Sequence, residues 1–370
     1  MKKKICFITN SELFFECFLS SHLLVLSKYF NITVVCDISK SKQLKEKYPT
    51  LNFFHIPVTR KKISFFSDII LFLKILCFLY RNNFFAVHSF TPKIGLITLC
   101  AAFVIRRNNR IHTFTGQIWA TKNKMHWKIL RFFDKCIFWL ANYIFSDSPS
   151  QSYFLLNEGF LNKNIPTLGN GSIAGVDLKK FSFKKAIKKN IRANLNIPND
   201  SFVLIFTGRI CLDKGVLDLI KAFKLLNDKN TFLLFVGDIE DDVKDLITFD
   251  DRVLYLGYQK DTSSYLIASD LFCMPSYREG FGSSIIEAAA VGLPSIGSNI
   301  IGITDAIQAN ITGLLHKPKD PEDIVKKIKI LKNDQKKYLK FSNAAKIRCH
   351  NLYSNDFVTK CWVKFYKSLL

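Results

Sequence analysis

The chain has 370 residues, which exceeds one ordinary hydrophobic core and fits two domains. Apolar residues make up 48% of it, with only 16 glycines and 10 prolines, so disordered and collagen-like proteins are excluded. The formal net charge of +23 favours an anionic partner.

The positive charge is concentrated at the two ends of the chain. Residues 1–165 carry 23 Lys and Arg against 8 Asp and Glu, and residues 322–370 carry 12 against 4. The middle segment, 166–321, is balanced at 18 against 18. Basic ends indicate contact with a nucleic acid or with the anionic face of a membrane. Solvated surface lysines remain the alternative explanation.

Cysteine usage and the amino terminus indicate a cytoplasmic protein. The ten cysteines form no Cys-x-x-Cys pair and do not cluster with histidine, which argues against a zinc site and for a reducing compartment. The first ten residues, MKKKICFITN, are followed by Glu12 and Glu16 before any apolar run of signal-peptide length. No stretch reaches the roughly 20 apolar residues that cross a bilayer, so we expect no spanning helix.

Short apolar strands alternate with helices in the amino-terminal half. The predicted strands are 5–9, 32–36, 85–88, 110–113 and 143–147. The predicted helices are 16–29, 65–80, 94–105 and 127–141. The strand, helix, strand order of the first elements predicts a βαβ unit and with it a parallel sheet. The glycine-rich loop LGNGSIAGVD, at 168–177, and the lysine-rich segment 179–199 then mark a domain boundary.

A second alternating series follows this boundary. Its predicted strands are 202–207, 231–236, 253–256, 271–275, 294–297 and 313–315. Its predicted helices are 214–226, 263–268, 283–291 and 321–332. This order predicts a second doubly wound α/β domain, built like the first.

The loop after strand 202–207 carries two cations at the start of a helix. Ligands of open α/β sheets bind at the carboxyl ends of strands, which directs attention to this loop. Arg209 and Lys214 are placed on either side of a helix amino terminus, where the dipole and free N–H groups favour an anion. The sequence therefore predicts a diphosphate site, with a helix capped by Asp213 and two solvated cations as the alternative.

The loop after strand 271–275 combines glycines with two glutamates. Gly280 and Gly282 let the backbone approach a ligand at the start of a helix, and Glu287 lies one turn inside that helix. A carboxylate beside a phosphate-binding turn is favourable when it accepts hydrogen bonds from sugar hydroxyls, which a nucleotide-sugar presents. The alternative is one glutamate favoured by the helix dipole together with one solvated glutamate. A weaker indication is the strand end at Gly257 and Tyr258, where a base can lie against the backbone.

These segments resemble the sequence pattern of the retaining glycosyltransferases of family 4, which have the GT-B fold. The two that carry the resemblance are GRICLDKG and PSYREGFGSSIIEAAAVGLPSIGS. The similarity continues through 302–307 and TGLLHKP, and more loosely through 1–180, so it covers nearly the whole chain. The stretches GNGSIAGVD, VHSFTPKIG and HTFTGQIWAT are similar to members that assemble bacterial capsular and O-antigen polysaccharides.

The resemblance implies a fold and a domain organisation. It implies two Rossmann-like doubly wound domains facing a central cleft. Residues 1–180 would bind the acceptor, and residues 181–350 would bind the nucleotide-sugar. Residues 351–370 would form a helix that crosses back to the first domain.

The resemblance also implies roles for individual residues. Arg209 and Lys214 match the pair that holds the donor diphosphate, Glu279 matches the glutamate beside the transferred sugar, and Glu287 matches the one that binds the ribose hydroxyls. Backbone contacts to the sugar and phosphate are implied for three neighbours, Gly280, Phe281 and Gly282. No metal and no other cofactor is expected, since the two cations and the helix end already face the diphosphate.

Two places depart from the family pattern. The first loop reads Thr9, Asn10, Ser11, Glu12, where many relatives have paired glycines. Thr115 stands where many carry a histidine at a strand end. The catalytic candidates of the first domain are therefore His88, His112 and Thr115, with hydrogen-bonded structural roles as the alternative for the histidines.

The expected activity is that of a retaining glycosyltransferase in O-antigen or capsule synthesis. The resemblance implies a UDP-sugar donor, with an N-acetylamino sugar as the transferred group, and a polyprenyl diphosphate-linked glycan as acceptor at the inner face of the cytoplasmic membrane. A nucleotide-sugar epimerase on the same fold is the alternative enzyme, and a basic nucleic-acid-binding protein is the alternative of another class.

A peripheral membrane location follows from the charge and the aromatic residues of the first domain. The helix 127–141 interleaves Lys128, Arg131 and Lys135 with aromatic residues, which is typical of an interfacial face. Lys122 and Lys124 precede it, and the basic run 60–62 precedes the helix 65–80, which we expect to cover the sheet.

Overall fold

The computed structural model describes residues 2–38, 43–57, 65–121, 124–160, 165–247 and 251–370. The chain divides into unit 1, Met1–Ala174 with Asn355–Leu370, and unit 2, Gly175–Ser354. The sequence predicted the second domain at 181–350. Unit 2 begins a few residues earlier and ends a few residues later than that. The basic run 60–62, Lys122 and the side chain of Lys124 lie outside the described residues.

Unit 1 is built on a six-stranded parallel sheet in the order β3-β2-β1-β4-β5-β6. The strands are β1 Lys4–Ile8, β2 Asn31–Cys36, β3 Asn52–His55, β4 Ala86–Phe90, β5 Asn109–Phe114 and β6 Tyr143–Ser146. The helices are α1 Glu12–Phe14, the π-helical turn η1 Phe15–Leu19, α2 Ser20–Leu26, α3 Leu44–Lys47, α4 Phe65–Arg81, α5 Pro92–Val104, the 3₁₀ turn η2 Ile118–Thr121, α6 Lys124–Leu140, α7 Pro149–Asn157 and α15 Asn355–Ser368.

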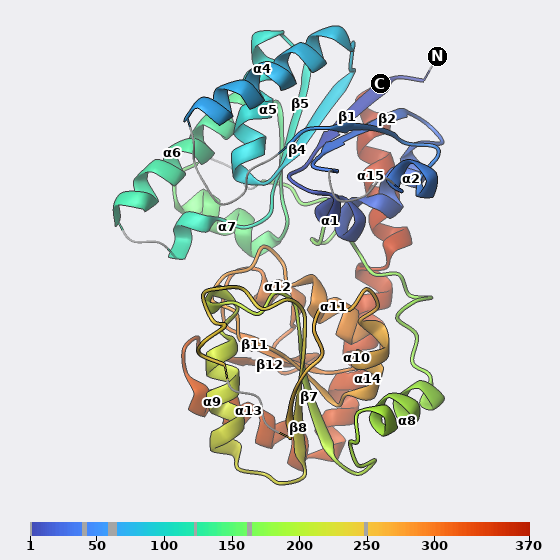
Figure 1. The fold of residues 1–370 in the computed structure, drawn as a ribbon, viewed down its shortest axis with the longest axis vertical. Coiled ribbons are helices and arrows are strands. Elements are labelled where there is room, and N and C mark those ends of the chain that lie inside the picture. Colours follow the sequence, from blue (N-terminus) through green and yellow to red (C-terminus); the bar gives the residue numbers. More distant parts are fainter. Residues whose placement is uncertain (1, 39–42, 58–64, 122–123, 161–164, 248–250) are drawn as a thin grey trace. The chain divides into compact units, whose positions relative to one another are not determined.

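Successive side chains along each strand of unit 1 point to opposite faces of the sheet, and helices pack on both faces. Phe7 packs with α2 and α15, whereas its neighbours Cys6 and Ile8 pack with α4 and α5 on the other face. Figure 1 shows α15 beside α2, far from it in sequence. Because both faces are covered, the inner strands β1, β2 and β4 are almost completely buried, as in other parallel sheets.

Unit 2 repeats this plan with the strand order β12-β11-β10-β7-β8-β9. Its strands are β7 Phe202–Thr207, β8 Thr231–Val236, β9 Val253–Tyr255, β10 Leu271–Met274, β11 Ser295–Ser298 and β12 Gly313–His316. Its helices are α8 Lys185–Asn194, the 3₁₀ turn η3 Leu212–Lys214, α9 Val216–Leu226, α10 Ser263–Ala268, α11 Ser283–Ala290, α12 Ile303–Ala306, α13 Pro321–Asn333 and α14 Gln335–Leu352. Numbered from β7 as the first strand of unit 2 and read from β9, this order is 3-2-1-4-5-6, which is the order of unit 1. The prediction of two Rossmann-like sheets is therefore confirmed.

Several elements differ from their predicted bounds. The first helix starts at Glu12 and not at residue 16, because Ser11 caps it by accepting a hydrogen bond from the Phe14 N–H at 3.2 Å. The edge strand β3, which the sequence analysis missed, exposes much of its length and shows no apolar alternation. No helix of the described segments is both long and apolar enough to cross a membrane.

Candidate active site

The loops that leave β7 and β10 meet in unit 2. These strands are neighbours although β8 and β9 lie between them in sequence, so the strand order reverses here. In open α/β sheets the ligand binds outside the carboxyl ends of the strands at such a switch point. The segments 208–215 and 275–287, which the sequence analysis identified, begin at this point.

Two backbone contacts hold these loops together. The Tyr277 N–H donates to the carbonyl oxygen of Asp213 at 2.8 Å. Gly215 has a φ of 64°, and a Cβ atom there would lie 2.0 Å from the carbonyl oxygen of Pro275. Only glycine fits this position, and the close approach places Lys214 beside the second loop.

Lys214 and Glu279 form an ion pair across the two loops. The Lys214 Nζ atom donates to Glu279 Oε1 at 2.5 Å. The side chains are only 17% and 11% exposed, so each charge depends on the other for much of its stabilisation. The sequence predicted a separate role for each residue and did not predict their contact.

Arg209 lies at the same edge of the sheet and is more open to solvent. Its Nη1 atom donates to Glu240 Oε1 at 2.6 Å, and its side chain is 58% exposed. Glu240 follows β8, whose loop approaches that of β7 so closely that a Cβ on Gly237 would lie 1.9 Å from the Gly208 carbonyl oxygen. Glu240 is not among the predicted site residues, although the acidic run 240–242 at a strand end was a usable signal.

The amino terminus of α11 lies in the second loop without a side-chain cap. Gly282 precedes the helix with a φ of 89°, and no side chain in the described residues caps its first turn. The uncapped N–H groups and the helix dipole favour an anion here. The Phe281 side chain is buried and its ring lies 5.2 Å from that of Tyr353, so this residue offers its backbone.

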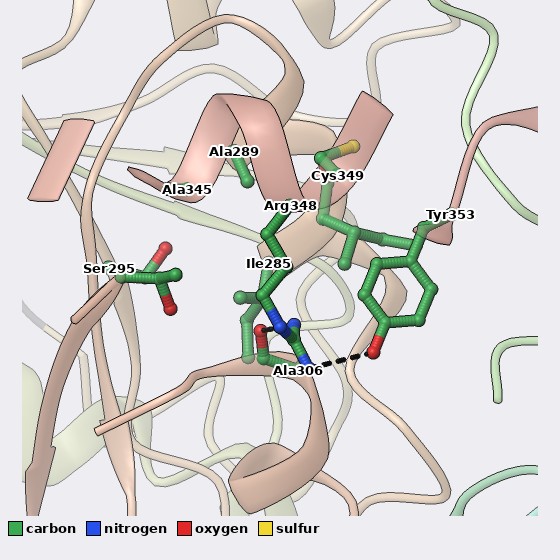
Figure 2. Close-up of a pocket in the computed structure, with 10 residues that line it drawn as sticks. Ile285, Ala289, Ser295, Ala306, Ala345, Arg348, Cys349 and Tyr353 are labelled. Atoms are coloured by element: carbon green, nitrogen blue, oxygen red, sulfur yellow. Dashed lines mark hydrogen bonds between the residues drawn. The ribbon is translucent and has the colours of Figure 1, made fainter. Parts of the chain in front are cut away.

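The glycine loop is braced from behind by α12 and α14. A Cβ on Gly302, which precedes α12, would lie 2.7 Å from the carbonyl carbon of Gly280. Arg348, on α14, donates to the α12 carbonyls of Asp305 at 2.7 Å and Ala306 at 3.0 Å. Its guanidinium also donates to the Tyr353 hydroxyl at 2.9 Å, a contact drawn as a dashed line in Figure 2. Both residues line a cavity of about 10 Å³.

Glu287 lies on α11 with its carboxylate in a poorly solvated position. Burial raises the pKa of Glu287 to about 7, Lys180 opposes the shift, and Asp261 adds to it. Lys180 itself pairs with Asp261 at 3.5 Å. No described group donates a hydrogen bond to Glu287, so its oxygens are available to a ligand's hydroxyls.

The remaining donor-side residues lie on neighbouring strand ends. Tyr258 is exposed in the loop after β9, next to Gly257, whose carbonyl oxygen accepts from the Gly237 N–H at 2.9 Å. Thr207 and Ser276, at the carboxyl ends of β7 and β10, have buried hydroxyls with no hydrogen-bond partner among the described groups. The sequence analysis singled out neither hydroxyl for a role.

The two candidate histidines of unit 1, His88 and His112, lie inside the sheet. Both His88 ring nitrogens are hydrogen bonded, Nδ1 with the Tyr366 hydroxyl at 2.6 Å and Nε2 with that of Thr113 at 2.8 Å. His112 Nδ1 lies 2.9 Å from the Ser89 hydroxyl, and burial lowers the pKa of His112 to about 3. Both side chains are fully buried, which favours the structural alternative for them.

The first loop of unit 1 also lies at a carboxyl edge. Thr9 Oγ1 donates to the carbonyl oxygen of Ser11 at 3.2 Å, and the Glu12 N–H donates to that of Asp37 at 3.2 Å. Thr115, the third candidate, follows β5 and is half-buried. Within the described ranges, no group of three or more His, Cys, Asp or Glu is placed to hold a metal ion.

Comparison with known sequences shows the family to which the chain belongs. Residues 187–348 match the family model described as glycosyl transferases group 1. The capsular polysaccharide biosynthesis glycosyltransferase CapM of Staphylococcus aureus is 30% identical over 349 residues, covering 92% of this chain and 91% of that protein. The UDP-Gal:alpha-D-GlcNAc-diphosphoundecaprenol alpha-1,3-galactosyltransferase of Escherichia coli is 27% identical, covering 90% and 87%.

Solved structures share the fold over the full chain. Sucrose-phosphate synthase from Thermosynechococcus elongatus has a TM-score of 0.84 at 17% identity, covering 100% of this chain and 99% of that one. Anabaena HepE in complex with UDP and glucose has a TM-score of 0.82 at 17% identity, covering 100% of each chain. The fold is that of the GT-B glycosyltransferases, and the chain is a hexosyltransferase-type enzyme that belongs to the group 1 glycosyltransferase family.

Proposed function

We propose that this glycosyltransferase moves a sugar from a UDP-sugar to a polyprenyl diphosphate-linked glycan, with retention of anomeric configuration, during synthesis of a bacterial O-antigen or capsule. The names of two relatives support the pathway, since one refers to capsular polysaccharide and the other to a UDP-sugar and a diphosphoundecaprenol-linked acceptor. The observation that carries the proposal is the Lys214–Glu279 ion pair beside the uncapped amino terminus of α11.

The donor diphosphate binds between the two cations and the helix end. An ammonium group has three N–H donors, so Lys214 can hold Glu279 with one and phosphate oxygens with the others. Arg209 adds a planar donor from the exposed side. Negative charge builds on the β-phosphate as the bond to the sugar breaks, and these groups stabilise it where it forms.

The two glutamates bind different parts of the donor. Glu279, fixed by Lys214, orients the hydroxyls of the transferred sugar and stabilises positive charge at its anomeric carbon. Glu287 accepts hydrogen bonds from the ribose hydroxyls. Its raised pKa supports this role, because a carboxylate in a poorly solvated position gains most from new donors.

No metal and no other cofactor takes part in this mechanism. Divalent cations in transferases neutralise the diphosphate, and Arg209, Lys214 and the α11 dipole supply positive charge at the corresponding place. The transferred group is an N-acetylamino sugar in this proposal, a choice that rests on the resemblance alone.

The enzyme works as a peripheral protein at the inner face of the cytoplasmic membrane. Ile129, Phe132 and Trp139 are exposed on α6, and Lys128 and Lys135 are exposed on the same helix. Arg131, which the sequence analysis counted among the membrane cations, is instead 23% exposed and pairs with Glu158 at 3.3 Å.

A transfer assay tests the proposal. The purified protein is incubated with a set of UDP-sugars and a short-chain polyprenyl diphosphate N-acetylglucosamine, and the products are analysed by mass spectrometry and NMR. We expect one sugar to be transferred with the anomeric configuration it has in the donor, and Glu279→Gln to lower the amount of product sharply. Release of free sugar without an acceptor product, or inversion, would contradict the proposal.

A further inference from the structure

A basic pocket of about 550 Å³ lies in unit 1, apart from the loops described above. It is lined by three segments, Lys2–Lys4, Asn83–Phe85 and Arg106–Asn109. These segments lead into β1, β4 and β5, so the pocket lies at the amino ends of the strands. The first loop of unit 1 and Thr115 lie at the carboxyl ends of this sheet, about 17 Å away along five-residue strands.

The pocket is strongly and uniformly cationic. Five of its ten lining residues are Lys or Arg, and none is acidic. None of these five cations forms an ion pair with an acidic residue in the described part of the chain. Unlike the Lys214–Glu279 pair, their charge is left for an external anion.

Arg107 is fixed in the pocket and retains an unused donor. Its Nη2 atom donates to the carbonyl oxygens of Leu79 at 2.7 Å and Asn82 at 3.1 Å, at the end of α4. A further bond joins Nη1 to Asn83 Oδ1. The Nε atom is buried without a hydrogen-bond partner in the described residues, and the other contacts hold the guanidinium in a fixed place in the pocket wall.

Exposed apolar side chains come from the helix ends around the pocket. Tyr80, 75% exposed, precedes Asn83 by three residues, and Val104, 60% exposed, precedes Arg106 by two. Trp139, 73% exposed, lies with its ring 5.1 Å from that of Phe103. Aromatic and apolar groups beside cations are typical of the boundary between lipid headgroups and acyl chains.

We propose that this pocket binds the phosphate of an anionic phospholipid headgroup, while Tyr80, Phe103, Val104 and Trp139 enter the membrane interface. The choice of ligand rests on the peripheral membrane location proposed above. A soluble phosphate would satisfy the cations and leave the apolar side chains in water, whereas a bilayer covers both. The site would tether unit 1 by the amino-terminal end of its sheet, opposite the first loop and Thr115 of the same unit.

Vesicle binding with a matched charge control tests the site. The test variant combines Lys2→Gln, Lys3→Gln and Arg106→Gln, all of them exposed side chains. The control combines Lys184→Gln, Lys185→Gln and Lys189→Gln, exposed in unit 2. Binding to phosphatidylglycerol-containing vesicles at low salt should weaken about a hundredfold in the test variant and less than twofold in the control.

Fluorescence quenching locates the contact on the protein. Vesicles with brominated acyl chains should quench Trp139. Trp139→Phe should lose most of the quenching, since Trp119 and Trp362 are buried and the partly buried Trp127 has the Arg131 guanidinium 4.8 Å from its ring. Equal loss of binding in the two triple variants would show diffuse attraction and overturn the proposal. Binding of glycerol phosphate or of a short DNA duplex through the same three residues, without vesicle binding, would also overturn it.

Sugar transfer to a water-soluble acceptor analogue separates this proposal from the proposed function. Both triple variants should keep wild-type turnover with that acceptor, because none of their residues lies among the candidate donor-site groups. If vesicle binding behaves as expected and no transfer is found, the proposed reaction fails and the headgroup site stands. If transfer is intact and the test variant binds vesicles like wild type, only the headgroup site fails.

Discussion

The Nζ atom of Lys214 lies 2.5 Å from Oε1 of Glu279, although the two residues are 65 positions apart in the sequence. Both side chains are mostly shielded from water, so removal of either leaves the other charge without its partner in a poorly solvated place. This relationship makes the stability of the loops and the affinity for the donor depend on the same contact.

Lys214→Met should therefore lower stability as well as donor use. We expect a loss of about 1–3 kcal/mol in the free energy of unfolding, measured by urea denaturation. The double variant Lys214→Met with Glu279→Gln should recover much of that loss and remain inactive. Independent, additive losses in the double variant would show that the ion pair contributes nothing to stability.

Arg209→Ala should separate donor use from folding. The side chain is 58% exposed, so its ion pair with Glu240 contributes little to stability. Loss of a charge-assisted hydrogen bond to the diphosphate should cost roughly 1.5–3 kcal/mol, or about ten- to over a hundredfold in kcat/KM for the donor. Glu240→Gln is the matched control and should change kcat/KM far less. Wild-type kinetics of the Arg209 variant would remove it from the site.

Substitution of Glu279 and of Glu287 should change different kinetic parameters. Glu279→Gln should lower kcat at saturating donor, because it lies where charge develops in the transition state. Glu287→Gln should chiefly raise the donor KM, since the ribose is remote from the bond that breaks. Steady-state kinetics of both variants decides this, and equal effects confined to KM would contradict a catalytic role for Glu279.

Donor binding should depend on pH through Glu287. Its pKa is raised by burial from 4.5 to about 7, so below pH 7 the folded protein must release a proton before the carboxylate can accept ribose hydroxyls. Affinity for UDP, measured by calorimetry, should fall below pH 7 in the wild type and less in Glu287→Gln.

The same shift predicts the pH at which Glu287 destabilises the fold. Between pH 4.5 and 7 the folded chain keeps a proton that the unfolded chain has lost, so the penalty grows with pH and is complete above 7. Glu287→Gln should raise the melting temperature at pH 8 and leave it nearly unchanged at pH 4.5. A larger gain at the lower pH would contradict the assigned shift.

Chelation of divalent metals should leave the activity essentially intact. The positive charge that the diphosphate needs comes from Arg209, Lys214 and the α11 dipole in this mechanism. Transfer is measured with and without excess EDTA, using a manganese-dependent glycosyltransferase as the positive control. Loss of transfer that magnesium or manganese restores would contradict the proposed diphosphate site.

The sequence predicted elements best where hydrophobic periodicity is strong. The predicted bounds of β7, β8 and α10 are those of the structure, and β3 was missed because an exposed edge strand lacks the alternating pattern. The loops at the switch point were found from their glycines and charges. Contacts between loops, such as Lys214 with Glu279 and Arg209 with Glu240, depend on strand order, which no local pattern encodes.

The return of α15 to unit 1 has a consequence for synthesis on the ribosome. Val358, Trp362 and Tyr366 are fully buried in the core of unit 1, yet they are translated only after the whole of unit 2. Unit 2 is one continuous segment and can fold as it emerges. Unit 1 cannot complete its core until α15 has been made, and until then the apolar residues that α15 covers are exposed to water. A chain that ends at residue 354 and has been released from the ribosome should therefore contain a protease-resistant second unit and a protease-sensitive first one.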